Sequence, residues 1–213
     1  MNLIDSLRQS VIEGDPQQAA ELARQGLAAG IDPLESINQG LVPGIQFTGE
    51  QFSCGEMFLP DLMLAAEAMK QALAVLEPEM ERRGSVRQSL GRVVIGTIQG
   101  DIHEIGKNLV GTLLSANGFE VFDLGVDVPP QRFAEKAAEV GAQIVGVSAL
   151  LPTTMVRQKE VIGALAGLGL RPQVKVMVGG APVTRRWADQ IGADGYSEDA
   201  LGAVALAKTL LKV

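Results

Sequence analysis

The sequence predicts an α/β domain built on a parallel sheet, preceded by a small domain made only of helices. From residue 92 onward, short apolar runs alternate with longer segments whose apolar residues recur at helical spacing. Before residue 84, the helical spacing occurs without strand-like runs. Strands that alternate with helices form parallel sheets with right-handed crossovers, whereas consecutive helices pack as a bundle.

Four helices with short connections are expected in the first domain, over residues 1–84. The pairs Asp15-Pro16 and Asp32-Pro33 each place an N-cap acceptor before a proline at the first helical position. We expect Pro43-Gly44 to kink or break the third helix, because proline lacks the N–H that a helix interior needs. Pro60 opens the fourth helix. The apolar face of that helix consists of Leu62, Ala66, Met69, Leu73 and Leu76.

Residues 77–91 differ in character from the segments on either side. They include Pro78, Gly84 and Gly91 among mixed charges, and they have no sustained apolar face. We expect residues 79–83 to extend the fourth helix and residues 84–91 to form an exposed linker. The second domain is therefore expected over residues 91–213.

Five strand–helix units are expected in the second domain. The strands are predicted at residues 93–98, 120–124, 144–148, 174–178 and 195–196. The helices are predicted at residues 107–117, 130–140, 153–168 and 184–191, with a last one around residues 201–210. Five such units fit the flavodoxin-like, Rossmann-type sheet order 2-1-3-4-5.

The composition argues against several classes of partner. A formal net charge of −7 disfavours nucleic acid, and one Trp and one Tyr provide few side chains for base stacking. No apolar run approaches the roughly 20 residues that a membrane span needs. Residues 1–13 lack the pattern of a secretory signal. The lone Cys54 cannot form an internal disulfide and is expected to be a small buried residue. Together these features indicate a cytoplasmic protein.

The only histidine of the chain, His103, follows the first predicted strand of the second domain. It therefore lies on the loop where open α/β sheets bind ligands. Asp101 lies two residues earlier, and a loop allows its carboxylate to reach back to the ring. Such a carboxylate fixes the tautomer of a metal-binding histidine. Gly106 leaves room for a bulky group near the backbone.

A lone histidine near a strand end is more often a surface residue than a ligand, and the heptapeptide Gly100–Gly106 alone does not decide between the two. One histidine is also too few for a structural zinc site, which needs four nitrogen or sulfur ligands. A metal bound here takes most of its coordination from elsewhere, as from a macrocycle.

The spacing Asp101-x-His103-x-x-Gly106 resembles the signature of cobalamin-binding domains that hold the cofactor base-off, with a histidine on cobalt. Two further elements of that signature follow in order, Ser148-Ala149-Leu150 and Gly179-Gly180, each at the end of a predicted strand. The segment before residue 92 resembles the helical cap of the same proteins. The whole chain is most similar to corrinoid proteins of bacterial and archaeal methyltransferase systems, and to the matching module of methionine synthase.

The resemblance assigns a role to individual residues. His103 becomes the lower axial ligand of cobalt, and a relay runs from it through Asp101 to the hydroxyl of Thr154. The other residues that the resemblance places at the cofactor and its nucleotide tail are Ile105, Gly106, Ser148, Leu150, Gly179, Gly180, Ala181 and Tyr196. Phe52 and Leu59 match the apolar residues that cover the upper face of cobalt.

Without the resemblance, two of these elements have simpler explanations. Thr153 and Thr154 could cap the helix that follows them. Gly179-Gly180 could be an ordinary tight turn after a strand. The chain lacks both the G-x-G-x-x-G and the G-x-x-x-x-G-K-[ST] pattern, so dinucleotide and nucleotide phosphate binding have little support.

The resemblance implies a corrinoid methyl carrier that has no turnover without partners. Cob(I)alamin accepts a methyl group delivered by a substrate-specific methyltransferase, and methylcobalamin donates it to a second methyltransferase acting on tetrahydrofolate or coenzyme M. A reductive activase is a further expected partner. Methanol, methylamines and methoxylated aromatics are the candidate donors. Nucleic acid and membranes are not expected partners.

Two other classes stay open at this point. One is a cobalamin-dependent sensor or regulator, although no basic helix-turn-helix accompanies the domain. The other is a response-regulator-like switch phosphorylated on an aspartate. Asp101 and Asp127 follow strands, but the acidic cluster that binds Mg²⁺ in such switches is not evident. A hydrolase triad is disfavoured because Ser148 does not lie in a G-x-S-x-G turn.

Overall fold

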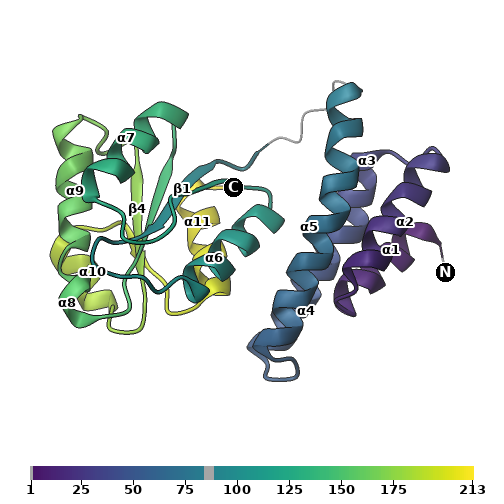
Figure 1. Ribbon diagram of the computed structural model, residues 1–213, viewed down its shortest axis with the longest axis horizontal. Coiled ribbons are helices and arrows are strands. Elements are labelled where there is room, and N and C mark those ends of the chain that lie inside the picture. The colour runs from purple at the N-terminus through teal and green to yellow at the C-terminus, as the bar shows by residue number, and fades with distance from the viewer. Residues whose placement is uncertain (1, 84–88) are drawn as a thin grey trace. The chain divides into compact units, whose positions relative to one another are not determined.

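A computed structural model describes residues 2–83 and 89–213 (Figure 1). The chain divides into two compact units, Met1–Gln88 and Ser89–Val213. Residues 84–88, the larger part of the predicted linker, lie outside the described residues. The domain limits expected from the sequence stay a prediction. None of the described helices combines the length and the apolar character needed to cross a bilayer.

The first unit consists of helices, as predicted. They are α1 (Leu3–Ile12), α2 (Pro16–Ala28), α3 (Pro33–Glu35), the π-helix η1 (Ser36–Leu41), α4 (Val42–Ser53) and α5 (Leu59–Arg82). The expected N-caps are present: Asp15 accepts from two backbone N–H groups of the first turn of α2, and Asp32 accepts from one at the start of α3. Helix α5 packs along α2 and runs to Arg82, so the predicted extension beyond residue 79 is confirmed.

The chain is not broken at Pro43-Gly44, where we expected a kink or a break. Segments α3, η1 and α4 follow one another without a gap, and the chain changes helical register before the proline. The N–H of Val42 donates to the carbonyl of Ile37, five residues back, and the missing N–H of Pro43 falls in the first turn of α4. A Cβ on Gly44 would lie 2.9 Å from the Cβ of Val11, so this glycine permits close packing of α4 on α1.

The second unit contains a five-stranded parallel sheet in the order β2-β1-β3-β4-β5, which confirms the predicted topology. The strands are β1 (Arg92–Thr97), β2 (Glu120–Asp123), β3 (Ile144–Ser148), β4 (Lys175–Gly179) and β5 (Gly195–Tyr196). The three central strands are rich in buried β-branched residues, as expected for strands covered on both faces.

Helices cover both faces of the sheet (Figure 1). They are α6 (Ile105–Ala116), α7 (Pro130–Val140), α8 (Pro152–Met155), α9 (Gln158–Gly167), α10 (Arg185–Ile191) and α11 (Ala200–Leu211). Helices α6 and α11 pack together, and α7, α9 and α10 form the other layer. In that layer Phe133, Leu165 and Ile191 pack into one apolar cluster with the sheet.

The single helix predicted over residues 153–168 is two helices. Helix α8 ends at Met155 and α9 begins at Gln158. The break has a physical basis in the polar groups on its two sides. Thr154 on α8 bonds to the loop after β1, whereas Gln158 is fully buried and bonds to the backbone of β3 and β4. In one straight α-helix, Thr154 and Gln158 would lie about one turn apart on the same side. Their partners lie in different parts of the domain, so two separate helical segments carry the two residues.

Candidate functional site

Three loops lie at the carboxyl end of the parallel sheet, where α/β proteins bind ligands. The first joins β1 to α6 and carries Asp101 and His103. The second joins β3 to α8 and carries Leu150. The third follows β4 and begins at Gly180. Strands β1, β3 and β4 are neighbours in the sheet, so residues far apart in sequence meet here.

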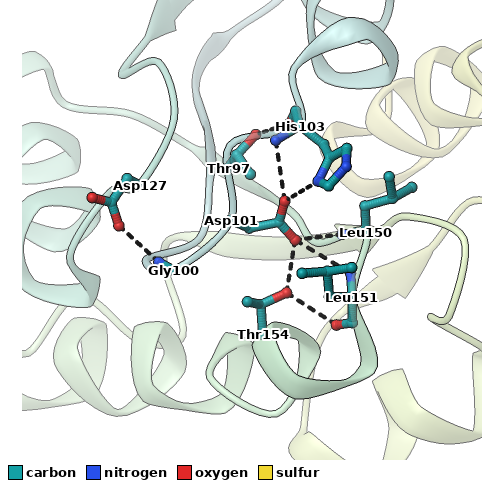
Figure 2. A network of polar contacts seen from close by, with 8 residues as sticks. All are labelled: Thr97, Gly100, Asp101, His103, Asp127, Leu150, Leu151 and Thr154. Atoms are coloured by element: carbon teal, nitrogen blue, oxygen red, sulfur yellow. Dashed lines mark hydrogen bonds and ion pairs between the residues drawn. The ribbon is translucent and has the colours of Figure 1, made fainter.

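Asp101 is the centre of a hydrogen-bond network that joins two of these loops (Figure 2). Its side chain is fully buried. Oδ1 accepts from the backbone N–H of His103 at 3.1 Å and lies 2.7 Å from the ring Nδ1 of the same residue. Oδ2 accepts from the N–H of Leu150 at 2.7 Å, the N–H of Leu151 at 3.3 Å and the hydroxyl of Thr154 at 2.7 Å.

These bonds determine the charge of the carboxylate. Burial acts to raise the pKa of Asp101, but the hydrogen bonds from Thr154, Leu150 and His103 outweigh it and hold the pKa well below its usual range. Asp101 is therefore ionised and can only accept hydrogen bonds. The ring Nδ1 of His103 must then carry the proton, which leaves the lone pair of Nε2 free to bind a metal.

Thr154 does not serve as a helix cap. The N-cap of α8 is Leu151, and no side chain caps that helix end. The Thr154 hydroxyl lies 2.7 Å from the Asp101 carboxylate and 3.0 Å from the carbonyl oxygen of Leu151. It has one hydrogen to donate, and the ionised carboxylate is the stronger acceptor. Helix α8 thus supplies a donor that keeps Asp101 in its ionised form.

The surface around His103 is unusually apolar. The His103 side chain is 48% exposed. Beside it in sequence, Ile102 is 75% and Ile105 is 70% exposed, and Leu150 of the neighbouring loop is 40% exposed. Large apolar side chains at such exposure favour a site that is covered by a ligand or a partner. A flat, largely apolar ligand whose metal takes a nitrogen ligand suits this surface.

The glycines predicted at the site differ in what surrounds them. A Cβ on Gly106 would meet no atom within 4 Å, so this position faces open space. A Cβ on Gly179 would meet only the carbonyl oxygen of Ser197, at 3.3 Å. Gly180 has a φ of +120°, and its Cβ would lie 1.8 Å from the carbonyl oxygen of Ala149. The backbone of the protein itself therefore requires glycine at position 180.

The remaining predicted site residues have less distinctive surroundings. Ser148 and Tyr196 are half-buried at the ends of β3 and β5, and Ala181 is exposed. Phe52 and Leu59 belong to the helical unit, Phe52 half-buried near the end of α4 and Leu59 exposed at the start of α5. Cys54 is exposed, so the expectation that it is buried is wrong. It is the C-cap of α4 and lies outside the packed helix faces.

Two polar residues of the site, Lys107 and Gln158, were not singled out from the sequence, and Asp127 was noted only as an aspartate that follows a strand. Asp127 bonds to the backbone of the loop that carries Asp101. Lys107 is buried on α6 and bonds to Asp123 and Asn108. Gln158 bonds to the carbonyl oxygens of Val147 and Gly179. Only the placement of Lys107 directly after Gly106 gave a hint, because a polar residue there interrupts an otherwise apolar helix face.

Comparison with known proteins identifies the family. A model of the B12 binding domain matches residues 91–205, and a second model with the same description matches residues 3–77. The chain is a corrinoid protein. A corrinoid protein of Desulfitobacterium hafniense is 49% identical over 99% of this chain and 98% of its own length. The trimethylamine corrinoid protein 1 of Methanosarcina acetivorans is 51% identical over 98% of this chain and 97% of its own.

A solved structure supports the same assignment for the fold. The methanol:cobalamin methyltransferase complex MtaBC of Methanosarcina barkeri matches 99% of this corrinoid protein and 80% of the matched chain, with a TM-score of 0.88 and 31% identity. The corrinoid protein thus belongs to the proteins of methyltransferase systems, and its cofactor is a corrinoid of the cobalamin type.

The residues present fit that cofactor. Cobalt in a corrinoid takes its equatorial nitrogen ligands from the macrocycle, so one protein nitrogen is sufficient. His103 offers Nε2 with its tautomer fixed by Asp101. The exposed apolar side chains Ile102, Ile105 and Leu150 offer surface that a macrocycle can cover, and Gly106 leaves space beside it.

Proposed function

We propose that this corrinoid protein shuttles a methyl group from a substrate-specific methyltransferase to a second methyltransferase, with His103 as the lower axial ligand of cobalt. When bound, the corrinoid supplies the cobalt that accepts and donates the methyl group. The observation that carries the proposal is the buried Asp101 carboxylate, which holds the proton on Nδ1 of His103 and directs the Nε2 lone pair outward.

Asp101 and Thr154 have defined roles in this proposal. Asp101 orients the imidazole and keeps it in one tautomer, because its Oδ1 bonds to both the ring and the backbone N–H of His103. Thr154 keeps Asp101 ionised through its bond to Oδ2. The three residues form a relay that fixes both the direction and the basicity of the ligand nitrogen.

The two parts of the chain divide the work. We assign residues 91–213 to the corrinoid-binding domain and residues 1–84 to a cap that covers the upper face of the cofactor. Phe52 and Leu59 supply the apolar cover, which excludes water from a reactive bond to cobalt. The linker is assigned to residues 84–91. Gly179, with Ser148, Ala181 and Tyr196, lines the slot for the nucleotide tail.

A methylamine is the proposed methyl donor. The relative named for trimethylamine shares about half of its residues with this corrinoid protein, whereas the methanol complex matches at 31% identity. Tetrahydrofolate or coenzyme M is the acceptor used by the second methyltransferase, and a reductive activase restores the cofactor after oxidation. To test the donor, the cobalamin-loaded protein is incubated with trimethylamine, dimethylamine or methanol, each with the methyltransferase that acts on that compound. Methylation of the bound cofactor is expected to be fastest from a methylamine.

The axial ligand can be tested directly because His103 is the only histidine of the chain. The protein is purified without a histidine tag, loaded with cobalamin and reduced to the paramagnetic cobalt(II) form. Growth with ¹⁵N-histidine is expected to change the nitrogen splitting in the electron paramagnetic resonance spectrum, because ¹⁵N and ¹⁴N differ in nuclear spin. His103→Ala is expected to remove that splitting. A spectrum insensitive to the label would contradict ligation by His103.

A further inference from the structure

We propose that Asp127 is a positioning residue for the axial ligand, because it clamps the backbone of the loop that carries Asp101 and His103. This inference rests on the proposed role of His103 as the cobalt ligand. Asp127 belongs to the connection between β2 and α7, so it acts on the site from a different loop. It does not contact the imidazole itself.

The contact between Asp127 and the His103 loop is reciprocal. The backbone N–H of Gly100 donates to Oδ1 of Asp127 at 2.7 Å. The backbone N–H of Asp127 donates to the carbonyl oxygen of Asp101 at 3.0 Å. These two bonds hold the backbone on either side of the peptide that joins Gly100 to Asp101, and Figure 2 shows the first of them. A hydrogen bond to a carboxylate is stronger than one between neutral groups.

The backbone of both partners explains why the clamp matters. Gly100 has a φ of +89°, a conformation that glycine reaches easily and leaves easily. Its geometry is therefore set by its contacts rather than by its own sterics. Asp127 has a φ of 54° and is one of two described non-glycine residues with a positive φ. Such a conformation costs about 1 kcal/mol or more and persists only where surrounding contacts hold it.

The loop that carries Asp127 is itself firmly anchored. Asp123 at the end of β2 accepts from the buried Lys107 and, at 2.8 Å, from the N–H of Gly125. The carbonyl of Gly125 accepts from the N–H of Thr97 at 2.9 Å, and the N–H of Val128 donates to the carbonyl of Thr97 at 3.0 Å. Strands β1 and β2 therefore fix the loop that carries Asp127, and Asp127 in turn fixes the loop after β1.

Thr97 extends the same support to His103. Its hydroxyl donates to the carbonyl oxygen of His103 at 2.8 Å, three residues beyond the clamp that Asp127 makes on Gly100. The loop is thus held at Gly100 by Asp127, at Asp101 by Thr154 and at His103 by Thr97. Removal of the Asp127 side-chain acceptor releases the loop at Gly100. Of the three points, this is the one at a flexible glycine.

Two substitutions distinguish the effect of the side-chain acceptor of Asp127 from the effect of its backbone conformation. Asp127→Gly removes the acceptor but accepts a positive φ without cost. Asp127→Asn keeps an acceptor oxygen and tolerates the left-handed region as well as aspartate does. Asp189→Asn, at an exposed position of α10, is the matched control for the loss of one negative charge.

The first measurement is amide hydrogen exchange of Gly100 in the cofactor-free protein, read by nuclear magnetic resonance. Asp127→Gly is expected to speed that exchange about tenfold or more, because the lost bond contributes to protection. Amides of β3 should keep parent rates, which separates local loosening from global unfolding. Asp127→Asn keeps a neutral acceptor and should protect this amide far better than Asp127→Gly, and Asp189→Asn should match the parent.

The second measurement is the fraction of bound cobalamin that shows the ¹⁵N-histidine splitting. Asp127→Gly is expected to lower that fraction, and Asp127→Asn is expected to restore it. Parent-like exchange and parent-like splitting in Asp127→Gly would overturn the proposal, as would equal defects in Asp127→Gly and Asp127→Asn. If the parent itself lacked the splitting, ligation by His103 would be refuted, and the exchange measurement would still decide whether Asp127 clamps the loop.

Discussion

The hydroxyl of Thr154 donates a hydrogen bond to Oδ2 of Asp101 across 2.7 Å, although the two residues are 53 positions apart in the chain. This contact joins the loop after β1 to the helix after β3. It supplies the donor that makes a fully buried carboxylate tolerable, since an ionised group without partners in such a place is costly. The loop after β1, which carries Asp101 and His103, and helix α8 are therefore expected to lose stability together.

Thr154→Val tests this dependence. The substitution keeps the shape of the side chain and removes the hydroxyl, so we expect a loss of about 1–3 kcal/mol in the free energy of unfolding. The pKa of Asp101 should rise toward its ordinary value. Urea unfolding of the cofactor-free protein measures the loss. Thr153→Val, at the exposed neighbouring position, is the control and should change stability little.

The pH dependence of this loss follows from the low pKa of Asp101. A carboxylate with a lowered pKa in the folded state stabilises the protein above the unfolded pKa of about 3.9, and that contribution declines as the pH falls below it. The unfolded pKa is the same in both proteins, so the difference between the parent and Thr154→Val is full wherever Asp101 is ionised in both folded proteins. It should narrow only as the pH falls through the pKa that Asp101 has in the folded variant, which lies below the unfolded value of about 3.9. A difference that stays constant down to the pH at which the parent itself unfolds would mean that the hydroxyl does not act through the charge of Asp101.

Gly179 and Gly180 are expected to respond differently to the same change. A Cβ on Gly179 meets one backbone oxygen at 3.3 Å, a contact that a small backbone shift relieves, so Gly179→Ala should lower the free energy of unfolding far less than Gly180→Ala. If Gly179 lines the slot for the nucleotide tail, the variant should bind cobalamin more weakly while its affinity for cobinamide, which lacks the tail, changes less. Equal losses for both cofactors would place Gly179 outside the slot.

Gly180→Ala is expected to destabilise the folded domain itself. The added Cβ would overlap the carbonyl of Ala149 at 1.8 Å, and the backbone φ of +120° disfavours any side chain. We expect a stability loss of several kcal/mol, on the order of the largest single-residue effects. Urea unfolding without cofactor measures it. Parent-like stability would show that the two loops can move apart at this point.

The sequence was informative where a local pattern of residues is enough to determine the structure. Alternating apolar runs and helical stripes predicted all five strands and their order, because parallel sheets leave few topologies. Asp101 and His103 were paired because a two-residue separation on a loop allows contact, and the structure has their atoms 2.7 Å apart. Thr154 was reached only through the resemblance, since no local pattern marks a contact across 53 residues.

The sequence was uninformative where a role depends on tertiary contacts. The role of Asp127 requires a left-handed backbone and a partner on another loop, and neither is encoded in its neighbours. Pro43 was expected to kink or break a helix, and the helix instead continues past the proline ring after a change of register just before it. The sequence indicated that Gly180 faces the ligand. Only the 1.8 Å between a Cβ at this position and the carbonyl oxygen of Ala149 shows that the backbone of the protein itself requires glycine there.

The cap prediction concerns Phe52 and Leu59. If they shield the upper face of the cofactor, replacing both by alanine should speed the light-induced loss of bound methylcobalamin and leave its affinity nearly intact. Phe47→Ala is a suitable control because Phe47 is another aromatic residue of α4 and is 42% exposed. Absorption spectra during illumination measure the rate. Identical rates in the double variant, the control and the parent would remove the cap from the mechanism.

The last prediction concerns Gln158, which links three elements beneath the site. Its Nε2 donates to the carbonyl oxygens of Val147 at 2.9 Å and Gly179 at 3.3 Å, and its Oε1 accepts from the indole N–H of Trp187 at 3.0 Å. The side chain is fully buried, so no water can replace it without rearrangement.

Gln158→Leu leaves the indole N–H of Trp187 without its acceptor, and we expect a loss of about 1–3 kcal/mol in the free energy of unfolding. Trp187 is the only tryptophan, so its fluorescence reports the change directly. Gln190→Leu, at an exposed position of α10, is the control. Combining Gln158→Leu with Trp187→Phe should cost less than the sum of the single losses, because each removes the same bond. Additive losses, measured by circular dichroism in urea, would show that the two side chains stabilise the domain independently.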